Sequence, residues 1–222
     1  MAIGLASALM GIGQNGLLVS LPFLVEQSAF SLPTWSILIA VGSLLFLPSA
    51  PFWGRYSDKH GPKKVVIQAL VGMAISFALL CFFAMFSSSS SGQTLLVCFI
   101  GLLVARIIYG CTVSGMVPAS QHWALLLCGK NNRLQAITSV SIGLSAGRLI
   151  GPLISILVLK LSPFAPLMVM ILLPCVALVG AMLLPAPKME SGQIEGRGQS
   201  SWLPNKALLP FLSSGLLLCA AV

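Results

Sequence analysis

Six long runs of apolar residues, separated by short polar turns, constrain the fold of this chain most strongly. Five of the runs lie near residues 3–25, 35–52, 65–86, 135–159 and 166–184, and another extends from residue 94 to the polar residues at 121–123. A helix needs about 20 such residues to span the apolar core of a bilayer, which is about 30 Å thick. The helix is favoured there because its backbone groups are hydrogen-bonded within it. We therefore expect an all-α, polytopic membrane protein with one spanning helix in each run.

The composition excludes other classes of protein. Hydrophobic residues make up 57% of the chain and charged residues only 7%, whereas soluble domains carry about 25% charged residues. The net charge of +8 does not indicate a nucleic-acid partner, because the basic residues lie in short turns and not on one soluble face. The six cysteines show no CxxC pair and no metal-ligand spacing, so we interpret them as small buried side chains and predict no metal or cofactor.

Catalysis and ion conduction are not indicated either. An enzyme inside the bilayer would need a nucleophile with a base, or paired carboxylates, within its spans. The two histidines are His60, in a polar turn, and His122, near the end of a run. No ring of charges or filter-like segment suggests a channel.

The basic residues predict how the chain is oriented. The turns after the second, fourth and sixth runs hold Arg55, Lys59, Lys63, Lys64, Lys130, Arg133, Lys188, Arg197 and Lys206, whereas the turns after the other runs hold only Lys160. Basic residues accumulate in cytoplasmic turns. We therefore expect the even-numbered turns to be cytoplasmic, in a protein of the bacterial inner membrane.

The carboxyl-terminal residues differ in character from the rest. We expect residues 1–185 to form a six-helix transmembrane bundle and residues 186–206, rich in Pro, Gly and charge, to form a cytoplasmic linker. Residues 207–222 are apolar again and predict the start of a seventh span. The sequence reads as a fragment whose seventh span is truncated.

The turn at residues 54–64, called here the charged segment, lies between the second and third runs. It contains Asp58, the only aspartate of the chain, and reads Gly-Arg-Tyr-Ser-Asp-Lys-His-Gly-Pro-Lys-Lys. It resembles the G-x-L-A-D-R-x-G-R-K pattern of the major facilitator superfamily, with Gly54, Asp58, Lys59, Gly61, Lys63 and Lys64 in register. Tyr56 and Pro62 depart from the pattern.

Two further motifs are similar to patterns of the same family. Arg106 is followed by Gly110 in the fourth run, and Gly147, Gly151 and Pro152 in the fifth run match the antiporter pattern G-x-x-x-G-P. Ser155 and Ile156 replace the glycine pair that usually follows. Gly143, Gly147 and Gly151 also recur every four residues, which predicts a face for close helix packing.

The resemblance covers the whole chain and implies the amino-terminal half of a drug or metabolite antiporter with twelve spans. It implies that the charged segment is a gating loop that braces two halves of the protein, with Asp58 at the positive end of a helix. It also implies a small-molecule substrate, alternating access and a lipid bilayer as surroundings. Coupling to protons is left open, and we expect the full-length protein to be a monomer.

Five polar residues inside the runs are candidates for substrate binding or coupling. Gln14, Asn15, Arg106, Tyr109 and Arg148 lie near the middle of the first, fourth and fifth runs. An arginine at the bilayer centre costs about 2.5–3.5 kcal/mol on insertion scales, and this chain has no acid within a run to neutralise it. We expect these residues to form one polar layer facing a substrate.

The charge of this layer favours an exporter of an anionic or zwitterionic metabolite or siderophore, because the planar guanidinium binds carboxylates and phosphates. Two alternatives stay open. Acids on further spans could pair with the arginines, which would suit a multidrug antiporter for cationic or hydrophobic compounds. The chain could also be a truncated scaffold that does not transport.

Overall fold

The computed structural model describes residues 2–88, 92–128 and 132–183, which belong to one compact unit. Within these residues the chain is entirely helical. The helices are α1 (Ala2–Gln27), α2 (Leu32–Leu44), α3 (Phe46–His60), α4 (Pro62–Ser87), α5 (Gln93–Val113), α6 (Met116–Cys128), α7 (Arg133–Leu159) and α8 (Ala165–Leu183). The predicted linker at 186–206 and the predicted seventh span at 207–222 lie outside the described residues.

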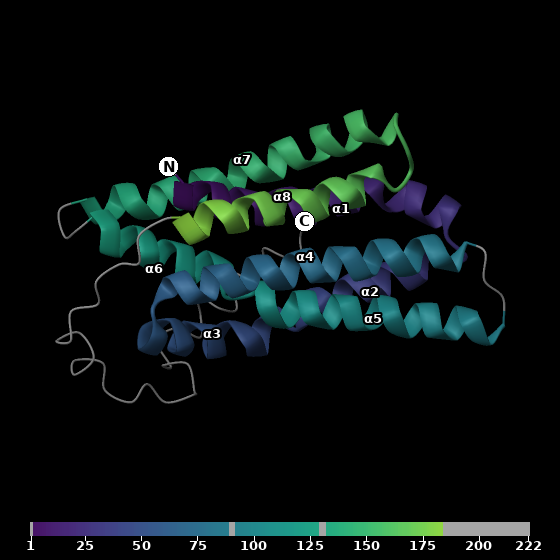
Figure 1. The fold of residues 1–222 in the computed structure, drawn as a ribbon, viewed down its shortest axis with the longest axis horizontal. Coiled ribbons are helices and arrows are strands. Elements are labelled where there is room, and N and C mark those ends of the chain that lie inside the picture. The colour runs from purple at the N-terminus through teal and green to yellow at the C-terminus, as the bar shows by residue number, and fades with distance from the viewer. Residues whose placement is uncertain (1, 89–91, 129–131, 184–222) are drawn as a thin grey trace, which may run out of the picture. The chain divides into compact units, whose positions relative to one another are not determined.

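The described helices form six stretches that are long and apolar enough to cross a membrane. Four are the single helices α1, α4, α7 and α8, and the other two are the pairs α2–α3 and α5–α6. All run along a common direction (Figure 1). The expected all-α architecture with six spans is thus confirmed, and the protein is an integral, multi-pass membrane protein.

Two spans are interrupted, which the apolar runs did not predict. The second breaks at Leu45 and the fourth at Ser114–Gly115. In each case a proline is the third residue of the following helix, Pro48 in α3 and Pro118 in α6. A proline lacks the N–H that would bond four residues back, and its ring crowds that carbonyl. The fourth residue back is Leu44 in one span and Ser114 in the other, so both breaks lie where the prolines act.

The expectation of a loop throughout the charged segment is wrong. Helix α3 continues through Asp58 to His60, and α4 begins at Pro62, so only Gly61 separates the two helices. Gly61 has φ 91°, a conformation that favours glycine. Pro62 suits the first turn of a helix, while Lys59 and His60 lie in the last turn of α3, where basic side chains are stabilised. The residues of the charged segment therefore occupy a tight corner between helices.

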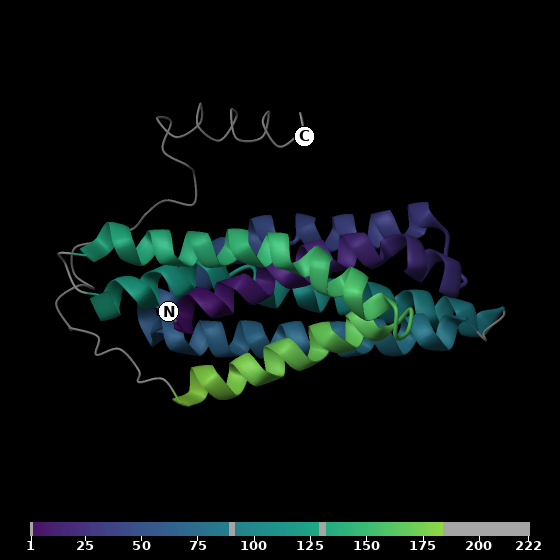
Figure 2. The same cartoon turned by 90° about the horizontal axis from the view of Figure 1, so that it is seen from above.

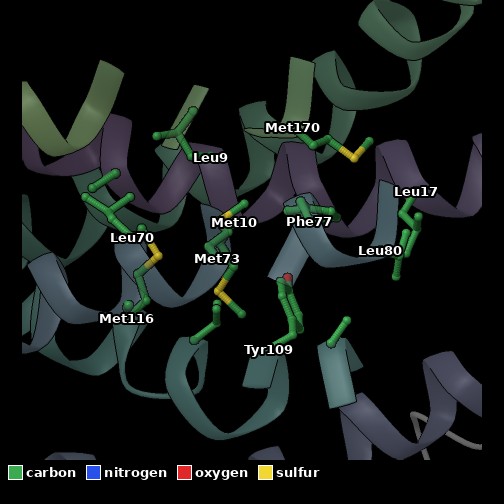
Figure 3. Close-up of a cluster of buried hydrophobic side chains, with 14 of the residues drawn as sticks. Leu9, Met10, Leu17, Leu70, Met73, Phe77, Leu80, Tyr109, Met116 and Met170 are labelled. Carbon is green, nitrogen blue, oxygen red and sulfur yellow. The ribbon is translucent and has the colours of Figure 1, made fainter. Parts of the chain in front are cut away.

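Helix α4 is central to the packing. It contacts α1, α3, α5, α6 and α8, and it buries more of its length than any other described span. Figure 3 shows its side chains Leu70, Met73, Phe77 and Leu80 against Leu9, Met10 and Leu17 of α1. By contrast, Leu149 and Leu153 of α7 and Val176 of α8 are exposed. An outer surface this apolar is suited to lipid and not to water.

Helices α1 and α7 touch along their backbones (Figure 2). A Cβ atom on Gly143 would overlap the carbonyl oxygen of Gly4, and one on Gly147 would overlap that of Ala8. On Gly151 it would lie 2.8 Å from the Cα of Ile12. Pro152 follows within α7 without ending the helix. The glycine row of the fifth run therefore lies in this helix contact, where any side chain would meet backbone atoms.

The indole of Trp53 joins α3 to the break in the fourth span. Its Nε1–H donates a hydrogen bond to the carbonyl of Cys111, which in a continuous helix would accept from residue 115. Gly115 makes room for Trp53, because a Cβ there would overlap the Cβ of the tryptophan. Trp53 therefore satisfies a carbonyl that the helix break releases.

We predict that replacing Gly147 by alanine destabilises the protein. The added methyl group would meet the backbone of α1, which cannot shift without separating the two helices, so the loss should be about 1–3 kcal/mol. Thermal unfolding in detergent measures it. The matched control is Gly180→Ala on α8, where nothing lies within 4 Å of the new Cβ. Equal melting temperatures for the two variants would contradict this packing.

We also predict that Trp53→Phe lowers stability by about 1–3 kcal/mol, because it leaves the Cys111 carbonyl without a donor. Trp123→Phe is the control. Trp123 is equally an indole and is almost fully buried, but its Nε1 has no hydrogen-bond partner among the described residues. Chemical denaturation of both variants separates loss of the hydrogen bond from loss of ring volume. A Trp53→Phe variant as stable as the parent would refute the role of Trp53.

Candidate functional site

A cavity of about 230 Å³ opens between α1, α2 and α5. Its polar lining residues come from all three helices, and its apolar lining is provided by leucine and isoleucine side chains. The lining comprises Gly13, Gln14, Asn15, Leu17, Leu18, Ile39, Gly42, Ser43, Arg106 and Tyr109. A small cavity with an apolar wall and a few convergent polar groups has the form of a ligand site.

Arg106 is the buried charge of this cavity. Its side chain is 3% exposed, and its Nε and Nη2 atoms are buried without a hydrogen-bond partner in the described part of the chain. The hydroxyl of Tyr109 is likewise buried and unpartnered. The acids within the described residues are Glu26, in the last turn of α1, and Asp58, near the end of α3. None of the described acids is therefore at the cavity to neutralise the guanidinium.

The position of Arg106 depends on close contact between α2 and α5. A Cβ on Gly110 would overlap the carbonyl oxygen of Gly42, and one on Gly42 would lie 3.3 Å from the carbonyl oxygen of Arg106. The two glycines thus let the helices approach backbone to backbone. Gly110, one turn after Arg106, has a structural role here, since it brings the arginine stem against α2.

The cavity gathers four of the five polar candidates. Gln14, Asn15, Arg106 and Tyr109 line it, whereas Arg148 does not. The amide of Asn15 donates a 3.1 Å hydrogen bond to the backbone carbonyl of Arg148. The backbone of Arg148 therefore lies at the same level of the bundle as the cavity. Its side chain is exposed. The expected layer with two converging arginines therefore holds one inside the cavity and one outside it.

A row of exposed polar side chains on α7 extends over residues 138–148 and ends at Arg148. Thr138, Ser141, Ser145 and Arg148 follow at helical spacing, and all four are exposed. A charged side chain in a span almost always faces protein or water. Part of this row also borders a surface groove of about 530 Å³ near the start of α7, which contains none of the expected binding residues.

The charged segment, at the carboxyl-terminal end of α3 and the start of α4, contacts helices α6 and α8. The carboxylate of Asp58 lies 3.8 Å from Nδ1 of His122 on α6, and the buried hydroxyl of Ser57 lies 3.3 Å from the same nitrogen. Lys63 donates a 3.0 Å hydrogen bond to the carbonyl of Met182, at the end of α8. Of the other expected residues of the segment, Gly54 and Lys59 lie on α3 and Lys64 lies in the first turn of α4. These contacts tie the corner between α3 and α4 to α6 and α8.

Sequence reasoning missed three residues of these sites. Ser43 lines the cavity, but a serine in a span carries no distinctive signal. Phe77 contacts Arg106 from α4 and is indistinguishable in sequence from any core phenylalanine. His122 was noticed only as a histidine near the end of a run, because its pairing with Asp58 joins residues 64 positions apart.

Several known proteins are similar to this chain. It is 29% identical over 151 residues to the multidrug resistance protein MdtG of Proteus mirabilis, a match that covers 66% of this chain and 34% of that protein. It is also 29% identical over 149 residues to the staphyloferrin B transporter of Staphylococcus aureus, covering 67% of this chain and 32% of that protein. The chain thus spans about a third of the length of these curated relatives.

A match to the model of a whole family extends further along the chain than either relative. The Major Facilitator Superfamily model matches residues 3–222, which includes the charged segment, the helix of Arg106 and the glycine row of α7. Together with the six spans, this match assigns the family. The chain belongs to the Major Facilitator Superfamily of membrane transporters.

Proposed function

We propose that this protein is a secondary active transporter that exports a small anionic or zwitterionic metabolite or siderophore by alternating access. The solute binds in the cavity between α1, α2 and α5, where Arg106 neutralises its negative charge and Gln14, Asn15 and Tyr109 provide further polar contacts. Binding near the middle of the spans suits alternating access, in which two bundles rock about a central site.

The observation that carries this proposal is the buried guanidinium of Arg106, which has no acidic partner among residues 2–88, 92–128 and 132–183. Burying a charge without a partner costs several kcal/mol, and the described acids lie elsewhere. A solute with a carboxylate or phosphate would supply the missing charge and the missing acceptors. One relative is named as the staphyloferrin B transporter, which supports the transport of a siderophore.

A second candidate is efflux of cationic or hydrophobic drugs. It is favoured by the relatives named multidrug resistance protein MdtG and by the apolar wall that Leu17, Leu18 and Ile39 give the cavity. In this case an acid beyond the described residues pairs with Arg106, and the arginine is structural. The charge of the transported solute separates the two candidates.

We propose a supporting role for Arg148 and for the charged segment. The polar row of α7, with Arg148 exposed in it, suits a face that meets water or a second bundle of helices. The corner between α3 and α4, held to α6 by Asp58 and His122, suits a gate at the cytoplasmic end of the protein.

Substitution of Arg106 tests the charge of the solute. Purified protein in proteoliposomes is assayed with citrate as an anion and tetraphenylphosphonium as a cation. An anion carrier should keep part of its citrate transport in Arg106→Lys. It should lose roughly 10- to 150-fold in Arg106→Gln, because a hydrogen-bonded charge is worth about 1.5–3 kcal/mol.

Arg148→Gln is the control for this experiment, since it removes the same charge from outside the cavity and should change citrate transport much less. Transport of the cation by the parent, with equal cation transport by Arg106→Gln, would exclude the anion carrier and favour the second candidate.

The proposed orientation is tested separately by labelling in intact cells. Lys59 and Ser88 are both exposed, near opposite ends of α4. In a cysteine-free background, a membrane-impermeant maleimide should label Ser88→Cys and leave Lys59→Cys unlabelled until the cells are opened. Labelling of position 59 from outside would reverse the orientation.

A further inference from the structure

Phe77 touches the cavity arginine without lining the cavity. It belongs to α4, is 0% exposed, and its ring centroid lies 5.9 Å from Cζ of Arg106. The same ring meets Tyr109 edge to face at 5.7 Å between centroids, as Figure 3 shows. Phe77 therefore contacts both unpartnered polar residues of the site from a helix that contributes none of the lining.

Tyr109 approaches the guanidinium as well. Its ring centroid lies 5.4 Å from Cζ of Arg106, and its ring stacks on Phe46 at 5.9 Å. We call Phe77 and Tyr109 the aromatic clamp. A guanidinium within about 6 Å of an aromatic ring is attracted to the face of that ring, and this attraction uses none of its N–H groups.

The clamp is itself held in place. Next to Phe77, the buried hydroxyl of Ser76 donates a 2.7 Å hydrogen bond to the carbonyl of Ala105, which precedes Arg106. On the side of α1, a Cβ on Gly13 would lie 3.1 Å from Cε2 of Phe77. The ring therefore fills the space between α1 and α5 and cannot turn freely.

This arrangement differs from that of an arginine paired with a carboxylate. In such a pair, the N–H groups of the guanidinium would already donate hydrogen bonds to the carboxylate. The aromatic clamp contacts the guanidinium through its rings, while Nε and Nη2 have no hydrogen-bond partner among the described residues. These two nitrogens donate from the same edge of the guanidinium, the edge that binds a carboxylate or phosphate through two parallel hydrogen bonds. A restrained plane reduces the entropy lost when such a group binds.

We propose that Phe77 is a positioning residue that, with Tyr109, fixes the plane of the Arg106 guanidinium for two-point binding of an oxyanion. The proposal rests on the proposed function, because it assumes that Arg106 binds the anionic group of the solute. It adds that specificity for an anion over its neutral analogue depends on a side chain outside the cavity.

The test compares two probes of the same shape, benzoate and benzamide, by calorimetric titration of the purified protein. Benzoate offers two acceptor oxygens to the guanidinium, whereas benzamide offers one and adds N–H donors. The variants are Phe77→Leu and Phe77→Met, which remove the ring, and Phe77→Tyr, which keeps it. Phe30→Leu is the control, because Phe30 is also buried in an aromatic pair, with Phe99, and is not among the cavity-lining residues.

Loss of the ring should weaken benzoate binding roughly 2- to 12-fold and leave benzamide binding nearly unchanged, since ordering a flexible side chain on binding costs about 0.5–1.5 kcal/mol. Phe77→Tyr should restore the preference for benzoate, and Phe30→Leu should retain it. A purely structural role would instead weaken both probes equally. In protein labelled with ¹⁵N-arginine, the Nε–H signal of Arg106 should also shift in Phe77→Leu without any ligand.

Two outcomes would overturn the proposal in different ways. If the parent prefers benzoate and both ring-free variants keep that preference, the positioning role of Phe77 is wrong while the anionic function stands. If the parent binds benzoate no better than benzamide, the anionic function fails and the positioning role fails with it. Should Phe77→Leu not fold, the Phe77→Met comparison decides by the same criteria.

Discussion

Backbone contact between helices at glycine is the interaction on which the rest of this bundle depends. Without a hydrophobic driving force inside lipid, helices associate through close packing. Gly143, Gly147 and Gly151 bring α7 against α1, and Gly42 with Gly110 brings α2 against α5. The first contact places Asn15 beside the backbone of Arg148, and the second presses the stem of Arg106 against α2. The cavity lies between helices that glycine has set at these short separations.

The buried arginine is the physical basis of the specificity proposed for this cavity. Its insertion costs about 2.5–3.5 kcal/mol at the bilayer centre, and contacts with Phe77 and Tyr109 recover about 0.5–2 kcal/mol each. These contacts use none of the N–H groups, so Nε and Nη2 of Arg106 still lack a hydrogen-bond partner among the described residues. A site with unmet charge and unmet donors binds an oxyanion in preference to a neutral solute, because the neutral solute leaves the same groups unsatisfied.

The corner between α3 and α4 and the cavity are connected through the broken spans. Helix α3 carries Trp53 and Asp58, and both reach across to the fourth span, at Cys111 and at His122. The fourth span also carries Arg106, less than two turns before Cys111. Movement of α3 would thus act on the break that separates α5 from α6. This arrangement gives the charged segment a physical route to the helix of the binding site.

The sequence by itself determined the class, the number of described spans and four of the five polar residues that line the cavity, because a bilayer penalises every unpaired polar group and leaves long apolar runs as the solution. It marked Gln14, Asn15, Arg106 and Tyr109 as exceptions within those runs. Only the tertiary structure decided that Arg106 is inside the cavity and Arg148 outside, since depth along a helix does not specify the face. The helix breaks follow from Pro48 and Pro118, which the apolar runs conceal. The partners Phe77 and His122 instead depend on contacts between distant residues, which no local pattern encodes.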